Sequence, residues 1–404
     1  MGEKVNAVFT IWIICSIIMI FTVADLMKSD RLYSEAENRV LASKPELSKE
    51  SVLSGEYAKG YEEYVTDQFV ARDKWVGIKT GLDVLLQKKD INGVYLGKDG
   101  YLIERHRPED FPGEQEEKRL SLLEDLVEKW NATVMLVPTA DNILTDKLPA
   151  NAAYFDEKAF LERVKKRIGG NNYVDVYSAL QEHREEDIYY RTDHHWTSLG
   201  AYYGYHAWVK ATGRLPYHYA TDKMQVVTEE FLGTLHSKVK LPSKADTIKI
   251  FPETNNREVS VTYDFRKETQ SYYEDSYLNT KNKYGYFLDD NHGFVEIQTG
   301  YLKKDSLFVI KDSYANSLIP LLAPHYKTIY VVDLRYFNGR LFPFMEQYLP
   351  QEGAAEVEGN TAAMEEEGNT VATEVAGSTA EVGKMDVLVL YNCVHFLEDF
   401  QYYK

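Results

Sequence analysis

The sequence predicts an α/β fold with a mainly parallel sheet. In two parts of the chain, 114–212 and 306–391, short apolar segments of strand length alternate with longer segments of helical periodicity. This alternation is typical of folds in which helices cover a parallel sheet. We expect helices over 114–130, 159–168, 198–212 and 316–324, and strands over 132–138, 173–176, 306–311, 328–333 and 386–391.

The chain before this core is predicted to contain a stalk, helices and a hairpin. Residues 29–60 are polar and are expected to form the stalk, so the main domain would span 61–404. Apolar residues recur every three or four positions over 61–86, which favours helices. Residues 91–103 are predicted to form a β-hairpin, because a Lys-Asp-Gly turn separates two apolar runs.

Two segments interrupt the alternation. Residues 225–300 are rich in Thr, Tyr, Asn and Lys and contain short β-like runs, which predicts an inserted β-rich lobe. Residues 351–384 consist almost wholly of Glu, Ala, Gly, Asn, Thr and Val and contain no aromatic residue. Such a composition buries too little apolar surface to offset the entropy of ordering, so we expect a disordered acidic insertion there.

The overall composition limits the partners of the protein. The net charge of −17 over 404 residues argues against a nucleic-acid partner. The 31 tyrosines suit a surface that stacks on sugar rings, and equally suit Tyr-rich strands and cores. Cys15 and Cys393 lie near opposite ends of the chain, so no disulfide is expected between them.

The N-terminal residues 1–28 are predicted to be a membrane anchor. Residues 7–24 are strongly apolar, carry no charge and are long enough to span a bilayer core. The rest of the chain would then lie outside the cytoplasmic membrane. A signal peptide cleaved after Ala24 is the alternative; the apolar run is longer than a usual signal segment, which favours the anchor.

The candidate catalytic residues are Asp193, His195 and Ser313. Ser313 follows the strand predicted at 306–311, where a hydroxyl is exposed at the carboxyl edge of the sheet and a helix N-terminus can stabilise an oxyanion. Residues i and i+2 of an extended segment point to the same side, so Asp193 can orient His195 toward Ser313. Together they supply the nucleophile, the base and the carboxylate that acyl chemistry needs.

Each of these residues also has a simpler interpretation. Ser313 could be a helix N-cap, and the pair His194–His195 could be structural. Asp193, His194 and His195 are also suitable ligands for zinc or iron. The chain has only 10 histidines and no His-x-x-x-His companion, so we expect no metal and no cofactor. His194 is expected to point away from the site, into packing or a structural hydrogen bond.

Several motifs resemble one bacterial family. Asp-His-His-Trp at 193–196, followed by Thr-Ser-Leu-Gly-Ala-Tyr, resembles the signature of the DHHW protein family, which is similar to the alginate O-acetyltransferases of the SGNH-hydrolase superfamily. Further blocks that resemble the family lie at 67–73, 93–97, 311–317 and 333–336. The resemblance implies a three-layer, flavodoxin-like fold with a parallel sheet.

The resemblance also implies roles for individual residues. Asp193 and His195 match the Asp-x-His pair of the O-acetyltransferase branch, and Lys311-Asp312-Ser313 is similar to the Gly-Asp-Ser nucleophile block, with Lys in place of Gly.

The oxyanion donors should follow the next two strands. Asn392 resembles the oxyanion asparagine of the superfamily, and the loop at Arg335 would supply a backbone N–H. Asn291 is a rival donor from the inserted lobe, and a turn residue is the simpler interpretation of Asn392.

These observations predict a membrane-anchored, extracytoplasmic O-acetyltransferase or acetylesterase that acts on hydroxyls of a cell-surface polysaccharide. The two activities share an acyl-enzyme and differ in whether sugar or water accepts the acyl group. By resemblance, a membrane-bound O-acyltransferase would supply the acetyl group. A non-catalytic glycan-binding or assembly protein on the same fold is the alternative, because a fold does not guarantee chemistry.

Overall fold

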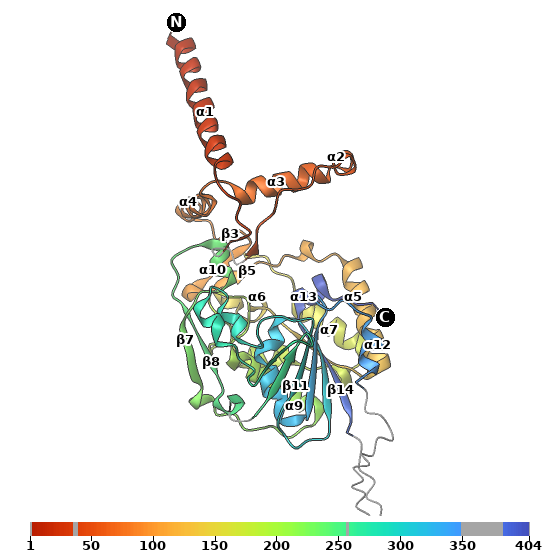
Figure 1. Ribbon diagram of the computed structural model, residues 1–404. Helices are drawn as coiled ribbons and strands as arrows, with labels where there is room; N and C mark the ends of the chain where they lie inside the picture. The colour runs from red at the N-terminus through yellow and green to blue at the C-terminus, as the bar shows by residue number, and fades with distance from the viewer. Residues whose placement is uncertain (1, 35–38, 256–257, 349–382, 404) are drawn as a thin grey trace, which may run out of the picture.

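The computed structural model describes residues 2–34, 39–255, 258–348 and 383–403 (Figure 1). The predicted disordered acidic insertion, 351–384, lies outside the described residues except for its last two positions.

A seven-stranded mixed sheet forms the centre of the molecule. Its strand order is β10-β9-β11-β13-β12-β14-β6. The four strands β13, β12, β14 and β6 are parallel, while β11, β9 and β10 join antiparallel at one edge. The bounds are β6 Thr133–Val137, β9 Ser260–Tyr263, β10 Lys267–Thr269, β11 Phe294–Gln298, β12 Ser306–Lys311, β13 Thr328–Asp333 and β14 Met385–Asn392.

The mixed sheet corrects the predicted parallel sheet and the predicted extent of the inserted lobe. Within the predicted lobe, β7 (Gln225–Phe231) and β8 (Asp246–Ile250) form a separate two-stranded sheet, whereas β9, β10 and β11 extend the central sheet. In β9 buried and partly exposed positions alternate, with Val261 and Tyr263 buried. That alternation is typical of an antiparallel strand at the edge of a sheet with one face covered. The central parallel strands, in contrast, are buried on both faces.

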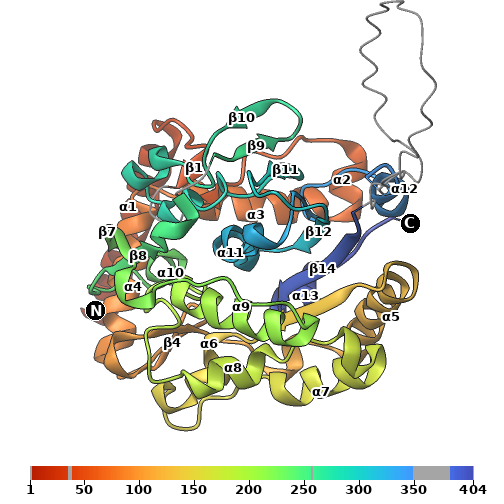
Figure 2. The same cartoon turned by 90° about the horizontal axis from the view of Figure 1, so that it is seen from below.

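Helices cover both faces of the sheet, and each face has its own core. Alternate residues of β12 divide between the cores: Leu307 and Val309 pack with α9 and α11, and Phe308 and Ile310 pack on the opposite face. One layer contains α8 (Val176–Glu182), α9 (Ser198–Thr212) and α11 (Ile319–Leu322); the other contains α5 (Gly113–Trp130), α7 (Glu157–Ile168), α12 (Leu341–Glu346) and α13 (Cys393–Asp399) (Figure 2).

Two predicted elements differ in detail. The strand predicted at 173–176 is a single bridge between Tyr173 and Val134, and α8 begins at Val176. The helix predicted at 316–324 starts earlier, as the 3₁₀ helix η9 (Ser313–Ser317), before continuing into α11. Ser313 is therefore the first residue of η9, directly after β12 and Asp312.

The N-terminal segment is helical. The helices are α1 (Gly2–Leu26), α2 (Lys49–Ser54), α3 (Glu56–Gln68) and α4 (Arg72–Leu85), with two short strands, β1 (Tyr33–Ser34) and β2 (Arg39–Val40), between α1 and α2. The predicted stalk, 29–60, thus contains regular structure. The predicted hairpin is a three-stranded sheet of β3 (Asp90–Ile91), β4 (Val94–Leu96) and β5 (Leu102–Glu104).

The predicted membrane anchor is not supported. Among the residues that the structure describes, no helix has the length and apolar character needed to cross a membrane. This finding contradicts the single-pass anchor over 1–28 and the membrane localisation drawn from it. The C-terminal part of α1 contacts the segments that follow it. The ring centroid of Phe21 lies 5.7 Å from that of Phe69, directly after α3, and 5.8 Å from that of Trp75 in α4.

Candidate active site

Asp193 and His195 lie on the loop before α9 and are already paired. The Nδ1 atom of His195 is 2.6 Å from Oδ1 of Asp193, and the same oxygen accepts the backbone N–H of His195 at 3.1 Å. A bridge between Tyr189 and Trp196 closes the loop at its base, and Thr197 caps α9. The carboxylate therefore fixes the orientation of the imidazole ring.

A neighbouring segment holds the second oxygen of Asp193. Thr234 donates to Oδ2 through its backbone N–H at 2.8 Å and its hydroxyl at 3.0 Å. Gly233 allows this close approach, because a Cβ atom there would lie 2.3 Å from the Cβ of Asp193. Neither residue was predicted as part of the site; the Gly-Thr pair at the start of α10 (Thr234–Val239) is a weak local signal for them.

Ser313 completes a continuous chain of contacts. Its Oγ lies 2.8 Å from Nε2 of His195, and the residue is buried. Asp312 precedes it and accepts the backbone N–H of Tyr314 at 2.9 Å, which caps η9. Asp312, not Ser313, is thus the helix cap. The backbone N–H of Ser313 is at the start of η9, where a helix provides no acceptor.

Tyr284 is a further site residue that the sequence analysis did not identify. Its ring stacks on His195, with centroids 3.7 Å apart and planes inclined by 10°. Its hydroxyl donates to the carbonyl of Ser313 at 3.2 Å. Tyr284 belongs to the short helix η8 (Lys283–Tyr286) of the segment predicted as the inserted lobe.

Electrostatics distinguish the two adjacent histidines. Burial raises the pKa of Asp193, but the charges of His194 and His195 and the hydrogen bonds from His195 and Thr234 outweigh it, so the pKa lies well below its ordinary value. Burial and the charge of His195 lower the pKa of His194 to about 3. His194 is therefore neutral at physiological pH, with Nδ1 at 2.8 Å from the Thr234 hydroxyl.

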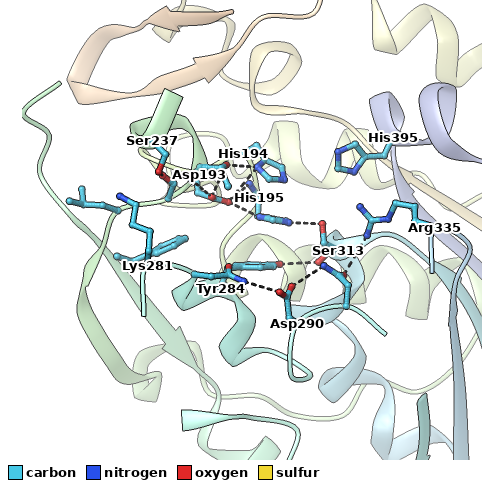
Figure 3. A pocket seen from close by; sticks show the side chains of 16 residues that line it. Asp193, His194, His195, Ser237, Lys281, Tyr284, Asp290, Ser313, Arg335 and His395 are labelled. Atoms are coloured by element: carbon cyan, nitrogen blue, oxygen red, sulfur yellow. Dashed lines mark hydrogen bonds and ion pairs between the residues drawn. The ribbon is translucent and has the colours of Figure 1, made fainter. Parts of the chain in front are cut away.

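A cavity of about 280 Å³ opens over this arrangement (Figure 3). Besides Asp193, His195 and Ser313, its lining includes Lys281 and His194. His194 does not point away from the site as predicted: it borders the cavity, while its Nδ1 atom contacts the Thr234 hydroxyl. The cavity gives the Ser313 hydroxyl access to a substrate.

Of the three predicted oxyanion residues, Asn291 and Arg335 lie in the lining of this cavity. Arg335 donates to both oxygens of Asp333, from Nε at 2.9 Å and from a terminal nitrogen at 2.6 Å. The ammonium of buried Lys311 is 2.9 Å from Oδ1 of Asn291 and 3.1 Å from Asp333. The Lys that replaces the expected Gly thus helps to fix the Asn291 loop.

Asn392 is placed elsewhere. Its backbone N–H donates to Asp312 at 2.9 Å, and its side-chain oxygen accepts the N–H of His395 at 2.8 Å, which caps α13. It lines a separate small cavity of about 20 Å³ rather than the one over Ser313. Its geometry is that of a cap.

Asp193, His194 and His195 form a candidate metal-binding group. Single ligand atoms of Asp193, His194 and His195 lie within 4.8 Å of one another. The hydrogen bond between His195 Nδ1 and Asp193 and the contact between His194 Nδ1 and Thr234 already use these atoms. A bound metal would have to displace both, so the donor set fits a hydrogen-bonded relay better than a metal centre.

The fold and the site together define an α/β protein with helices on both faces of a mixed sheet and a Ser-His-Asp arrangement after strand β12. Residues 121–332, just over half of the chain, match the family described as "DHHW protein", and the chain belongs to this family.

One curated relative shares part of the chain. It is the probable alginate O-acetylase AlgJ of Pseudomonas syringae pv. tomato, 30% identical over 166 residues. The match covers 37% of this chain and 41% of the relative, so the chain spans well under half the length of that protein.

Two solved structures have a similar fold. A DHHW family protein from Eubacterium siraeum has a TM-score of 0.57 at 21% identity, and the match covers 78% of this chain and 98% of that one. Bacillus cereus PatB1, solved with a sulfonyl adduct, has a TM-score of 0.54 at 17% identity, covering 77% of this chain and 97% of that one.

Proposed function

We propose that the protein is an O-acetyltransferase that places an acetyl group on a hydroxyl of a polysaccharide, through Ser313, His195 and Asp193. The observation that carries the proposal is the unbroken series of contacts from Asp193 through His195 to Ser313 at the wall of a cavity. The partial match to an alginate O-acetylase supports the choice of acetyl group and polysaccharide.

The geometry assigns a role to each residue. Ser313 attacks the acetyl carbonyl of the donor while its proton passes to Nε2 of His195. The donor C–O bond then breaks, and His195 returns the proton to the leaving oxygen, which produces an acetyl-enzyme. A sugar hydroxyl attacks this ester with His195 again as base, and Ser313 is released. Asp193 stabilises the imidazolium that forms in each half-reaction.

Water in place of sugar would give an esterase by the same steps. We propose transfer because the matched relative is described as an O-acetylase. The donor inferred from the family resemblance, a membrane-bound O-acyltransferase, stays a prediction, as does the identity of the polysaccharide.

The proposal is tested by incubating the full chain with an activated acetyl ester, with and without a uronic-acid polysaccharide as acceptor. We expect one acetyl group on Ser313 by peptide mass spectrometry, and more acetylated sugar than free acetate when the acceptor is present. Ser313→Ala should lower turnover by roughly 10³-fold or more.

Ser317→Ala, in the same 3₁₀ helix but outside the cavity lining, is the matched control and should keep its activity. Turnover by Ser313→Ala equal to that of the unchanged protein would refute the proposal. Sugar binding without any acetyl-Ser313 would favour the glycan-binding alternative.

A further inference from the structure

A second histidine–carboxylate pair stands beside the nucleophile. Nδ1 of His395, on α13, is 2.9 Å from Oδ2 of Asp312, the residue directly before Ser313. The side-chain nitrogen of Asn392 also lies 2.9 Å from this Nδ1. That amide group can only donate, so the two contacts compete for one ring nitrogen. The contact with the buried carboxylate is charge-assisted and is the stronger, so we assign Nδ1–H as its donor.

This contact fixes the ring through Nδ1 and leaves Nε2 free of it. With Nδ1 held by Asp312, Nε2 lies on the opposite edge of the imidazole. His395 lines the same cavity as Ser313 and Arg335, and its side chain is 21% exposed (Figure 3). Its ring centroid is 5.9 Å from that of His194. The ring is therefore fixed on one side and accessible from the cavity on the other.

The surroundings of His395 favour its charged form. Burial lowers its pKa, but the hydrogen bond to Asp312 and the charge of that carboxylate outweigh this, so the pKa is raised. Arg335 opposes the protonated form and Glu104 supports it. Glu398, on the same helix, interacts with His395 as well. His194, packed against the ring, is neutral at physiological pH because its own pKa is about 3.

The expected asparagine donors are engaged elsewhere. The Asn392 amide caps α13 through its oxygen and contacts His395 through its nitrogen. The amide nitrogen of Asn291 donates to Asp290 at 2.9 Å, and its oxygen accepts from Lys311. These contacts engage one of the two N–H groups of each amide and hold both amides to partners other than Ser313, which favours a different donor for an oxyanion there.

We propose that His395 is a second catalytic histidine, whose Nε2–H donates to the acyl oxygen and stabilises the oxyanion formed when Ser313 attacks. Asp312 is then a positioning residue that holds the donor and caps η9 at once. This inference rests on the proposed acyl transfer. It divides the chemistry between two histidines: His195 moves the proton, and His395 binds the negative charge.

The proposed role of His395 requires its protonated form, which predicts a loss of activity at alkaline pH. His395 must be protonated to keep its full charge, so activity falls as the pH increases through the raised pKa of His395. The decrease in activity at high pH, the alkaline limb of the profile, is therefore assigned to deprotonation of His395.

The test compares His395→Gln and His395→Ala with the unchanged protein. Glutamine keeps an N–H donor but cannot ionise. We expect kcat to fall by roughly 10- to 100-fold in His395→Gln and by about 10²- to 10³-fold in His395→Ala, with KM changed by less than about 3-fold. The alkaline limb should disappear in both variants. His206→Gln, on α9 and outside the cavity lining, is the control and should keep the full profile.

Two results would overturn the inference. One is a kcat and an alkaline limb that survive in both variants. The other, which needs no variant and so does not depend on their folding, is an unchanged protein without any alkaline limb. Acetyl-Ser313 should still form slowly in His395→Gln, which separates failure of this inference from failure of the proposed acyl transfer.

Discussion

The Nε2 atom of His195 lies 2.8 Å from the Oγ atom of Ser313, although 118 residues separate them in the chain. Asp193 binds the other nitrogen of the same ring at 2.6 Å. The tautomer with a proton on Nδ1 satisfies both contacts and leaves Nε2 free to accept the proton of Ser313. The proposed catalytic groups, from two distant segments, thus meet around one imidazole.

His195→Ala should be far more damaging than His194→Ala. We expect a loss in kcat of about 10³- to 10⁴-fold for His195→Ala, because the base is removed, and less than about 10-fold for His194→Ala. His194 is a poor base, since its pKa is about 3. Steady-state hydrolysis of an acetyl ester measures both. Equal losses, or inactivation of the unchanged protein by chelators, would favour the metal interpretation instead.

Tyr284 should act through its ring more than through its hydroxyl. Tyr284→Phe keeps the face that stacks on His195 and loses only hydrogen bonds of 3.2 Å to Ser313 and 3.4 Å to Ser317. We expect a loss of less than about 5-fold in kcat for this variant.

Tyr284→Ala removes the ring, leaves a cavity and should lose about 10²-fold in kcat, with a decrease of roughly 3 kcal/mol in the free energy of unfolding. Chemical denaturation and ester hydrolysis measure the two effects separately. If the Phe and Ala variants are equally active, the stacked ring has no role in positioning His195.

Gly233→Ala should displace Asp193. The added methyl would lie 2.3 Å from the Cβ and 2.4 Å from Oδ2 of Asp193, so one of the two loops must shift. We expect the free energy of unfolding to decrease by about 1–3 kcal/mol, and kcat by roughly 10- to 100-fold because the carboxylate no longer orients His195.

Gly81→Ala is the matched control. An added methyl there meets nothing within 4 Å, and the residue lies within α4. This change should raise the free energy of unfolding by up to about 1 kcal/mol, because alanine favours helix. Full activity in Gly233→Ala would show that the two loops adjust without moving the carboxylate.

Glu157 should make the free energy of unfolding fall as the pH rises from about 4.5 to about 8. Burial and the charge of Asp141 raise its pKa to about 8. The contacts agree: the Thr139 hydroxyl is 2.5 Å from Asp141 and 2.8 Å from Oε1 of Glu157, and its single proton can serve only one of them. The carboxyl of Glu157 must supply the other proton, so Glu157 is neutral near pH 7.

Glu157→Gln tests this assignment. The folded-state pKa lies above the unfolded value near 4.5, so the stabilisation is fully present below about pH 4.5 and is lost as the pH rises through about 8. Glutamine places an amide N–H where the acid proton was and does not ionise. Between about pH 5 and pH 9, the free energy of unfolding of Glu157→Gln should rise relative to that of the unchanged protein by on the order of 1–3 kcal/mol. Chemical denaturation at several pH values measures this difference. If the difference in free energy of unfolding between the two proteins is the same at every pH, the pKa of Glu157 is not raised.

The local part of the site was predictable from sequence. Asp193 and His195 are two residues apart on an extended loop, so their pairing needs no tertiary contact. Ser313 follows a strand whose central residues, 307–310, are all apolar, which places it at the carboxyl edge of the sheet whatever the neighbouring strands are. Periodicity likewise predicted α5, α7, α9 and the helical segment after Ser313, because a helix buries one stripe of residues. It did not predict the shorter helices α8, α12 and α13.

The rest was decided by tertiary structure. Whether residues 260–298 form a lobe or extend the sheet depends on which strand edge is open to them, and that edge was β13. Tyr284, Thr234 and His395 reach the site from segments whose sequences do not indicate that they meet Ser313, because packing sets where these segments come together. The same holds for Asn392: a strand-end asparagine can cap a helix or donate to an oxyanion, and the acceptors around it select the cap. A sequence specifies the contacts of near neighbours directly, whereas contacts between distant segments follow from the packing of the whole core.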